Sequence, residues 1–221
     1  MKKILLVAVL FMATVCAQAQ SGLGIGLRGG LNYANATGDG ADDNSEYKFG
    51  AHAGLTFHYD LSEMVGLKLE TIYSNKGYKY ESDVRSNGID VETDINTALS
   101  YIDVPLLANV KAGPLFFEVG PQLSFLITGK DKFKQKTRDS NGNEVAGFPD
   151  RDEERDIEDL YENVDFGYAA GLGWMSDAGF GVGLRYNGGI KSFTKSSSGN
   201  NDKWRHSVFQ LSLMYRFGAN N

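Results

Sequence analysis

Cysteine, proline and long apolar runs are scarce in this chain of 221 residues. It has one cysteine, Cys16, and four prolines. A single cysteine cannot form an intrachain disulfide or a thiolate metal site. No segment approaches the roughly 20 consecutive apolar residues that a membrane-spanning helix needs. The composition therefore excludes a disulfide-stabilised scaffold and a helical membrane protein.

The N-terminus has the residue order of a secretory signal peptide. Lys2 and Lys3 precede an apolar run over 4–14, and Ala17-Gln18-Ala19 follows. Charged, apolar and small-residue segments in this order direct export and are then removed. We predict cleavage after Ala19, which leaves 20–221 as one mature domain without Cys16. Val15, directly before that cysteine, disfavours a lipoprotein.

Charge and aromatic content narrow the class further. The formal net charge is −6, and loss of Lys2 and Lys3 makes it −8. An acidic chain does not neutralise phosphates, so no nucleic acid is expected as a partner. Glycine occurs 27 times, tyrosine 11 times and phenylalanine 13 times. An exported chain rich in glycine and aromatics favours a membrane-spanning β-barrel.

Apolar and polar residues alternate with a period of two in eight segments. In the first, Leu23, Ile25 and Leu27 alternate with glycines and Arg28. Soluble strands usually have about 5 or 6 residues, whereas tilted membrane strands need roughly 9 to 11. The length of the pattern therefore predicts membrane-spanning strands. They cover 22–33, 47–59, 65–74, 101–110, 117–125, 166–174, 180–187 and 209–217.

The connections between these segments alternate between short and long. Three are tight turns, at 60–63, 111–114 and 176–177. Four are long and polar, at 34–46, 79–99, 128–163 and 191–204. Short periplasmic turns and long outer loops are the pattern of an outer-membrane barrel. The predicted fold is all-β: an eight-stranded antiparallel up-and-down transmembrane β-barrel with long extracellular loops.

Two of the long connections carry further signals. Ser86-Asn87-Gly88 is a hairpin turn between apolar flanks, so the third and fourth strands are predicted to project beyond the membrane. Ile157, Leu160 and Tyr161 have helical spacing, which predicts a short helix within 152–162.

Four motifs occur in order along the chain. They are LETIYSNKG at 69–77, YIDVPLL at 101–107, FEVGPQ at 117–122, and DFG with GLG at 165–167 and 171–173. In these motifs the chain resembles the outer-membrane β-barrel, or porin-family, proteins common in the Bacteroidota, and the resemblance spans nearly all of the mature chain. It implies fold and location, the cell outer membrane, more firmly than any activity.

Charged residues gather on the faces predicted to point inward. A charged side chain in the lipid-facing band is destabilising by roughly 2 to 4 kcal/mol for Arg or Lys at the midplane, so the segregation supports this register. The interior of an eight-stranded barrel is just wide enough for side chains to fill it. We therefore expect an ion-pair network that fills the lumen, with a selective pore as the alternative. The residues are Arg28, Lys48, Lys68, Glu70, Asp103, Glu118, Asp165, Arg185 and Arg216.

Other candidate sites are weaker. The G-x-G-x-x-G match at 24–29 lacks the flanking helix of a nucleotide site. His206 beside Ser207 would suit an outer-rim hydrolase. Asp139 with Asn141 and Asn143 starts like a calcium loop, but Glu144 replaces the required glycine. We expect no catalytic residue, metal or cofactor.

The sequence favours a non-enzymatic barrel with a structural or surface-interaction role through its outer loops. A small-solute channel is the alternative, and a lipid-modifying enzyme or protease is the third possibility. The expected partners are outer-membrane lipids and lipopolysaccharide, the barrel assembly machinery during insertion, and an unidentified extracellular ligand or envelope protein. We expect a monomer.

Overall fold

The computed structural model describes residues 23–38, 45–86, 88–195 and 203–218. The predicted signal peptide, 1–19, lies outside these residues. The elements are β1 (Leu23–Thr37), β2 (Ser45–Asp60), β3 (Val65–Ser86), β4 (Ile89–Ala112), β5 (Leu115–Asp139), β6 (Arg151–Asp156), the 3₁₀-helix η2 (Glu158–Leu160), β7 (Val164–Met175), β8 (Phe180–Gly189) and β9 (Arg205–Arg216). Among the described residues, no helix is long and apolar enough to cross a membrane.

Eight strands close into an antiparallel ring. Each of β1 to β5 pairs with its sequence neighbour, β5 pairs with β7, and the ring continues through β8 and β9. It closes where β9 pairs with β1, for example Leu211 with Leu31. The described residues thus confirm the predicted eight-stranded barrel, with β6 added outside the ring on the edge of β5.

The alternation predicted from the sequence fixes which side chains face inward. Leu27 and Leu31 are exposed on the outside, whereas Arg28 and Asn32 are buried inside. Ile72, the apolar misfit of its segment, faces inward and is 1% exposed. Pro105 also faces inward, and the β3–β4 pairing skips the positions opposite it because proline has no N–H to donate.

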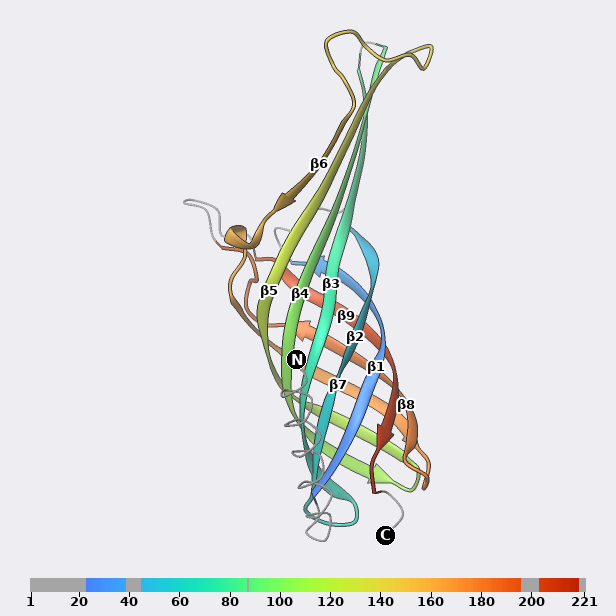
Figure 1. Ribbon diagram of the computed structural model, residues 1–221, viewed down its shortest axis with the longest axis vertical. Helices are drawn as coiled ribbons and strands as arrows, with labels where there is room; N and C mark the ends of the chain where they lie inside the picture. The colour runs from blue at the N-terminus through green and yellow to red at the C-terminus, as the bar shows by residue number, and fades with distance from the viewer. Residues whose placement is uncertain (1–22, 39–44, 87, 196–202, 219–221) are drawn as a thin grey trace, which may run out of the picture.

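Three strands are longer than the sequence pattern predicted. β3, β4 and β5 continue past the barrel rim as a twisted ribbon (Figure 1), and β6 lies along β5. The projection of β3 and β4 is confirmed. The loop expected over 128–163 is wrong in part, because β5 runs on to Asp139 and β6 follows.

The short helix expected within 152–162 is confirmed only as the single turn η2, because β6 occupies the first part of the range. Asp152, Glu154 and Asp156 alternate along β6 and lie opposite lysines of β5, and such cross-strand pairs of opposite charge favour a strand. The apolar spacing produces only the single turn η2. Ile157 and Tyr161, which flank it, are buried, while Leu160 is 61% exposed.

Candidate functional site: a filled lumen and a protruding sheet

Five charged side chains form a central cluster inside the barrel. Arg28 comes from β1, Lys68 and Glu70 from β3, Glu118 from β5 and Arg185 from β8, and none of these side chains is more than 3% exposed. Arg185 Nη1 lies 2.6 Å from Glu70 Oε2, and its Nη2 lies 2.5 Å from Glu118 Oε1. Arg28 Nη1 is 3.0 Å from Glu118, and Lys68 contacts both carboxylates. Two glutamates thus hold three cations across the lumen.

Neutral polar side chains continue the filling toward the outer end. His52 lies between Asn32 Oδ1, 2.8 Å from Nδ1, and Ser212 Oγ, 2.9 Å from Nε2. Arg28 Nε donates to the same serine at 3.0 Å, and Gln210 donates to Asn32 at 2.9 Å. Each of these residues is buried. The central cluster is therefore part of a connected hydrogen-bond network and does not line an open, water-filled channel.

A second ion pair lies nearer the outer end of the barrel, between Lys76 of β3 and Asp103 of β4. Lys76 Nζ donates to Asp103 Oδ1 at 2.7 Å and lies 4.9 Å from the centre of the Tyr101 ring. Asp165 is buried beside Lys76 at a cavity of about 10 Å³, which is room for about one water molecule. Its Oδ1 has no hydrogen-bond partner among the described residues. Asp165 therefore lies near this pair without forming a direct ion pair in the described chain.

Two of the predicted lumen residues lie away from the centre. Arg216 is at the periplasmic end, where its Nη2 contacts Asp60 at 2.7 Å and Lys111 contacts the same carboxylate at 2.8 Å. Lys48 lies near the outer rim and forms no ion pair with the described carboxylates; it donates to Asn96 Oδ1 at 2.6 Å and to the Thr97 carbonyl at 3.1 Å. Both residues were predicted to face the lumen, but they lie at other heights along the barrel axis than the cluster. The alternation of residues along a strand predicts which face a residue is on and not how far along the barrel it lies.

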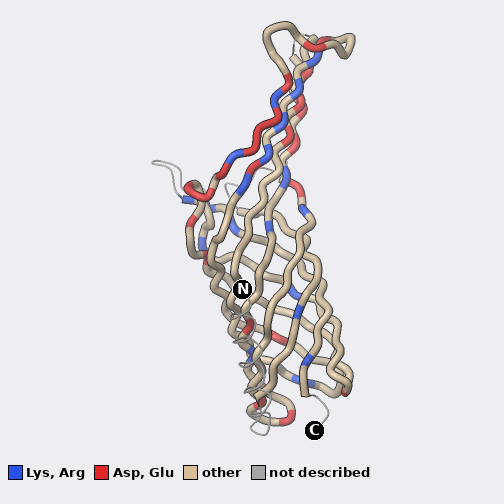
Figure 2. Tube along the Cα trace, viewed as in Figure 1, with Lys and Arg blue, Asp and Glu red and all other residues tan. Residues whose placement is uncertain are grey.

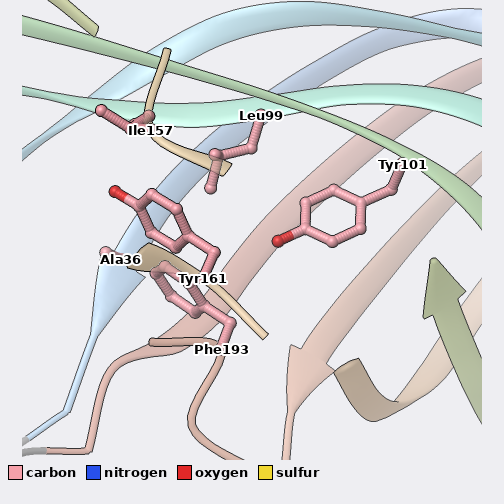
Figure 3. Close-up of a cluster of buried hydrophobic side chains, with 6 residues drawn as sticks. All are labelled: Ala36, Leu99, Tyr101, Ile157, Tyr161 and Phe193. Atoms are coloured by element: carbon pink, nitrogen blue, oxygen red, sulfur yellow. The ribbon is translucent and has the colours of Figure 1, made fainter. Parts of the chain in front are cut away.

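An apolar cluster closes the outer mouth of the barrel. Tyr161 and Phe193 stack with their ring centres 5.7 Å apart, and Phe193 stacks on His206 at 4.0 Å. Burial raises the pKa of the Tyr161 hydroxyl, which hydrogen-bonds to Tyr78 at 3.1 Å. We call this cluster the lid (Figure 3); its members are Ala36, Leu99, Tyr101, Ile157, Tyr161 and Phe193.

The orientations of His206 and Ser207 exclude them as a catalytic pair. His206 points inward, where its Nε2 lies 3.2 Å from the Tyr101 hydroxyl. Ser207 is the next residue of β9 and points outward, where its hydroxyl lies 3.4 Å from that of Tyr47 and 3.3 Å from that of Tyr186. Successive strand residues face opposite sides of a sheet, so the two side chains cannot act together.

The ribbon of β3 to β6 carries most of its ion pairs on one face. β5 supplies a column of cations, Lys130 to Arg138 at alternate positions, between acidic columns on β4 and β6. Lys130 contacts Glu154 at 2.8 Å, and Arg138 contacts Asp150 at 2.7 Å. Figure 2 shows both signs concentrated on these strands, while the barrel wall is largely uncharged.

The opposite face of the ribbon continues the inner surface of the barrel above the rim, with apolar residues on β3 and β4 and the charged residues Arg151, Glu153 and Arg155 on β6. Val84 is 57% exposed and Phe148 is 61% exposed. Together with Ile89 and Val91 they line a groove of about 520 Å³, and Gln135, Thr137 and Arg151 complete its wall. We call this the tip groove. It is an open hollow outside the barrel, with polar and apolar parts of similar extent.

The candidate calcium loop that begins at Asp139 forms a turn and an ion pair within the chain. Asp139 Oδ1 accepts hydrogen bonds from the amides of Asn141 and Asn143, at 2.8 and 2.9 Å, which stabilises a turn. Asp150 is paired with Arg138. Within the described ranges, no group of three His, Cys, Asp or Glu side chains is placed to hold a metal ion.

Sequence reasoning missed three charged partners of the lumen: Lys76, Asp60 and Lys111. Lys76 follows Ser74 at the same parity, so a longer third strand would have included it. Asp60 and Lys111 were assigned to turns, but each is the last or near-last residue of its strand and still faces the lumen.

Several solved structures align with most of this chain at low sequence identity. Solved structures of similar fold include Ail, the attachment invasion locus protein of Yersinia pestis, at 15% identity over 89% of this chain and 99% of that chain, with a TM-score of 0.40. Neisserial surface protein A matches at 14% identity over 89% and 98%, with a TM-score of 0.39. CarO2 of Acinetobacter baumannii matches at 13% identity over 87% and 98%, with a TM-score of 0.42.

Likeness at this level says nothing about binding or activity. A search of curated proteins found no match to this chain. The model of the family described as "Outer membrane protein beta-barrel domain" matches residues 17–195, which is most of the sequence. The chain therefore belongs to the outer-membrane β-barrel domain family.

Proposed function

We propose that this protein is a non-enzymatic component of the outer membrane that binds a protein partner outside the cell through the tip groove. Export by the signal peptide at 1–19 and assembly by the barrel insertion machinery precede this role. The resemblance of its motifs to Bacteroidota barrels supports an origin in that envelope. The observation that carries the proposal is an open groove with exposed apolar side chains on a sheet that extends far beyond the barrel.

The length of the strands supports this location for the groove. β5 makes its last pair with β7 at Phe125 and continues to Asp139, which at about 3.3 Å per residue is a reach of roughly 45 Å. Exposed apolar side chains that lie together in a groove can anchor a binding partner. Val84 and Phe148 offer such anchors, and polar groups on the wall of the groove can fix the orientation of a partner.

The lumen supports the same conclusion by contrast. The central cluster and the lid occupy the middle and the outer part of the barrel interior, and the hollow of about 310 Å³ at the periplasmic end ends at Lys68 of the cluster. A binding role therefore fits the protruding sheet better than the small-solute channel that remains the alternative.

The test uses a displayed library of random peptides selected on the protein in lipid nanodiscs. We expect enriched peptides with apolar anchors, and we expect their affinity to fall at least about 10-fold for Val84→Asp and for Phe148→Asp, because a charge then lies in the apolar floor. Asp83→Asn, one residue away on the charged face, is the matched control and keeps full binding.

Two results would reject the proposal. One is a library that shows no enrichment above empty nanodiscs. The other is an enriched set that binds Val84→Asp and Phe148→Asp as well as it binds the unaltered protein.

A further inference from the structure

A second groove lies on the outside of the barrel wall. It has a volume of about 600 Å³ and spans β7, β8, β9 and β1, with one wall from β2. Ala170 lies at its floor, where a small side chain leaves the sheet uncovered. We call it the wall groove. Its rim consists of Leu31, Tyr33, Phe49, Leu184, Phe209 and Leu211, each more than 40% exposed.

Polarity along the outward face of β9 changes in one direction. Leu211 is aliphatic, Phe209 is aromatic, and Ser207 is a hydroxyl that shares hydrogen bonds with Tyr47 and Tyr186. Arg205 follows at the outer end of the same face. Positions 205 and 211 are six residues apart, about 20 Å at the usual strand rise. The face therefore runs from a cation at the rim through hydroxyls and rings to an apolar hollow.

The cation at the rim has spare capacity for an anion. Arg205 is partly exposed and forms no ion pair with the carboxylates of the described residues; its Nε is buried, so a ligand outside the barrel would bind the terminal Nη groups. Lys191, just after β8, is 3.6 Å from Glu162 and 58% exposed, so it already shares a carboxylate. A guanidinium can donate two parallel hydrogen bonds to a phosphate, which a lone ammonium cannot.

We propose that the wall groove binds one acyl chain of an anionic membrane lipid, whose phosphate lies at Arg205. Because the barrel wall faces lipid hydrocarbon, the wall groove has to be filled. The change in polarity from the cation at the rim to the aliphatic floor matches the order of headgroup and acyl chain in a lipid. A second copy of the barrel fits the groove less well than a lipid. Its outward faces are apolar and offer no anion to Arg205. The hydroxyls of Tyr47, Tyr186 and Ser207 lie at the level of the ester region.

Native mass spectrometry of the protein released from mixed micelles tests this. The probes are phosphatidylglycerol and phosphatidylcholine with identical acyl chains. We expect the unaltered protein to retain one phosphatidylglycerol, at least about 5-fold more often than phosphatidylcholine. Ala170→Phe fills the floor and removes the bound lipid of either kind. Arg205→Gln keeps a bound lipid but abolishes the preference between headgroups.

Ala108→Phe is the matched control, because Ala108 is an exposed outward alanine on β4, away from the groove. Ala170→Leu is a smaller filling variant with the same expected loss. Heat-modifiable gel mobility shows that each variant is folded. Equal lipid retention in Ala170→Phe and Ala108→Phe, an unchanged headgroup preference in Arg205→Gln, or a lipid-free dimer of the unaltered protein would each overturn the proposal.

Discussion

At the scale of single residues, the barrel interior depends on how two carboxylates share three cations. Glu70 and Glu118 each contact Arg185, whose planar guanidinium reaches both at once. Arg28 and Lys68 complete the cluster. Removal of one partner from a buried ion pair leaves an uncompensated charge, which is more damaging than the pair itself is stabilising. The cluster therefore stabilises the barrel only as a unit.

We predict that Glu70→Gln lowers the free energy of unfolding by about 3 to 5 kcal/mol, because one carboxylate then faces three buried cations. The measurement is urea-induced unfolding in detergent micelles, followed by gel mobility without heating. Adding Lys68→Met to Glu70→Gln removes the surplus cation and is expected to restore part of the loss. Glu92→Gln, on the exposed face of the ribbon, is the control and changes stability by less than about 1 kcal/mol. Equal midpoints for Glu70→Gln and Glu92→Gln would contradict the assignment.

At the scale of elements, β6 shows how charge decides local structure. Its sequence has no alternation of apolar and polar residues, and all six of its residues are exposed. It is held by pairing with residues 130–135 of β5 and by the ion pairs of Lys130 with Glu154 and Arg138 with Asp150. Exposed ion pairs contribute little individually, so this strand is the least stable part of the sheet.

The attachment of β6 is expected to depend on pH. The hydrogen bond from Arg138 lowers the pKa of Asp150, and the one from Lys130 lowers the pKa of Glu154. A carboxyl group with a lowered folded pKa stabilises the folded state above its unfolded pKa of about 4, and this contribution is lost as the pH falls through the folded pKa. β6 should therefore stay attached at neutral pH and detach below about pH 4.

Pepsin cleavage within 147–157 measures this detachment, with rates at about pH 3 and pH 5 divided by those of a free peptide of the same sequence. We expect relative cleavage to rise at the lower pH. In Glu154→Gln, part of that rise should already be present at the higher pH. A relative rate that does not change with pH would show that the ion pairs do not hold β6.

At the scale of the whole molecule, the barrel is filled in layers from the central cluster to the outer mouth, while a hollow of about 310 Å³ remains at the periplasmic end. Along β3 the layers are the central cluster at Lys68 and Glu70, the neutral layer at Ser74, the ion pair at Lys76, and the lid, against which Tyr78 packs. The polar layers match the narrow interior of an eight-stranded barrel, which side chains can fill. The apolar lid then separates the lumen from the outer solvent.

We predict that the protein in planar lipid bilayers gives no steady conductance steps, because both the polar layers and the lid would have to move for an ion to pass. The measurement is single-channel recording in 1 M salt (about 3 Å screening length, so surface charge does not limit entry). Trp204→Ala, which trims a side chain packed against the lid, leaves the polar layers in place and should also be silent. Defined, reproducible steps from the unaltered protein would instead favour the channel.

The alternation of residue types was sufficient to predict most of the fold. Leu27 and Arg28, or Leu69 and Glu70, differ so strongly in hydrophobicity that only one register keeps charge out of lipid. Turn residues at 60–63, 111–114 and 176–177 fixed the short connections. Where the pattern weakened, as on β6 and the outer half of β5, the predicted loop was wrong in part and the predicted helix was reduced to the turn η2, because partners distant in sequence stabilised strands there.

The sequence by itself determined the barrel, its strand count, its inward and outward faces and its orientation, since each follows from local periodicity and turn length. Only the tertiary structure decided which inward charges meet. Arg28 and Arg185 are 157 positions apart yet share Glu118, whereas Lys48 and Arg216, on the same kind of face, lie toward opposite ends of the lumen. The height of a residue along the barrel axis depends on how the strands are staggered. This stagger is a property of the closed ring and cannot be deduced from the sequence of one strand.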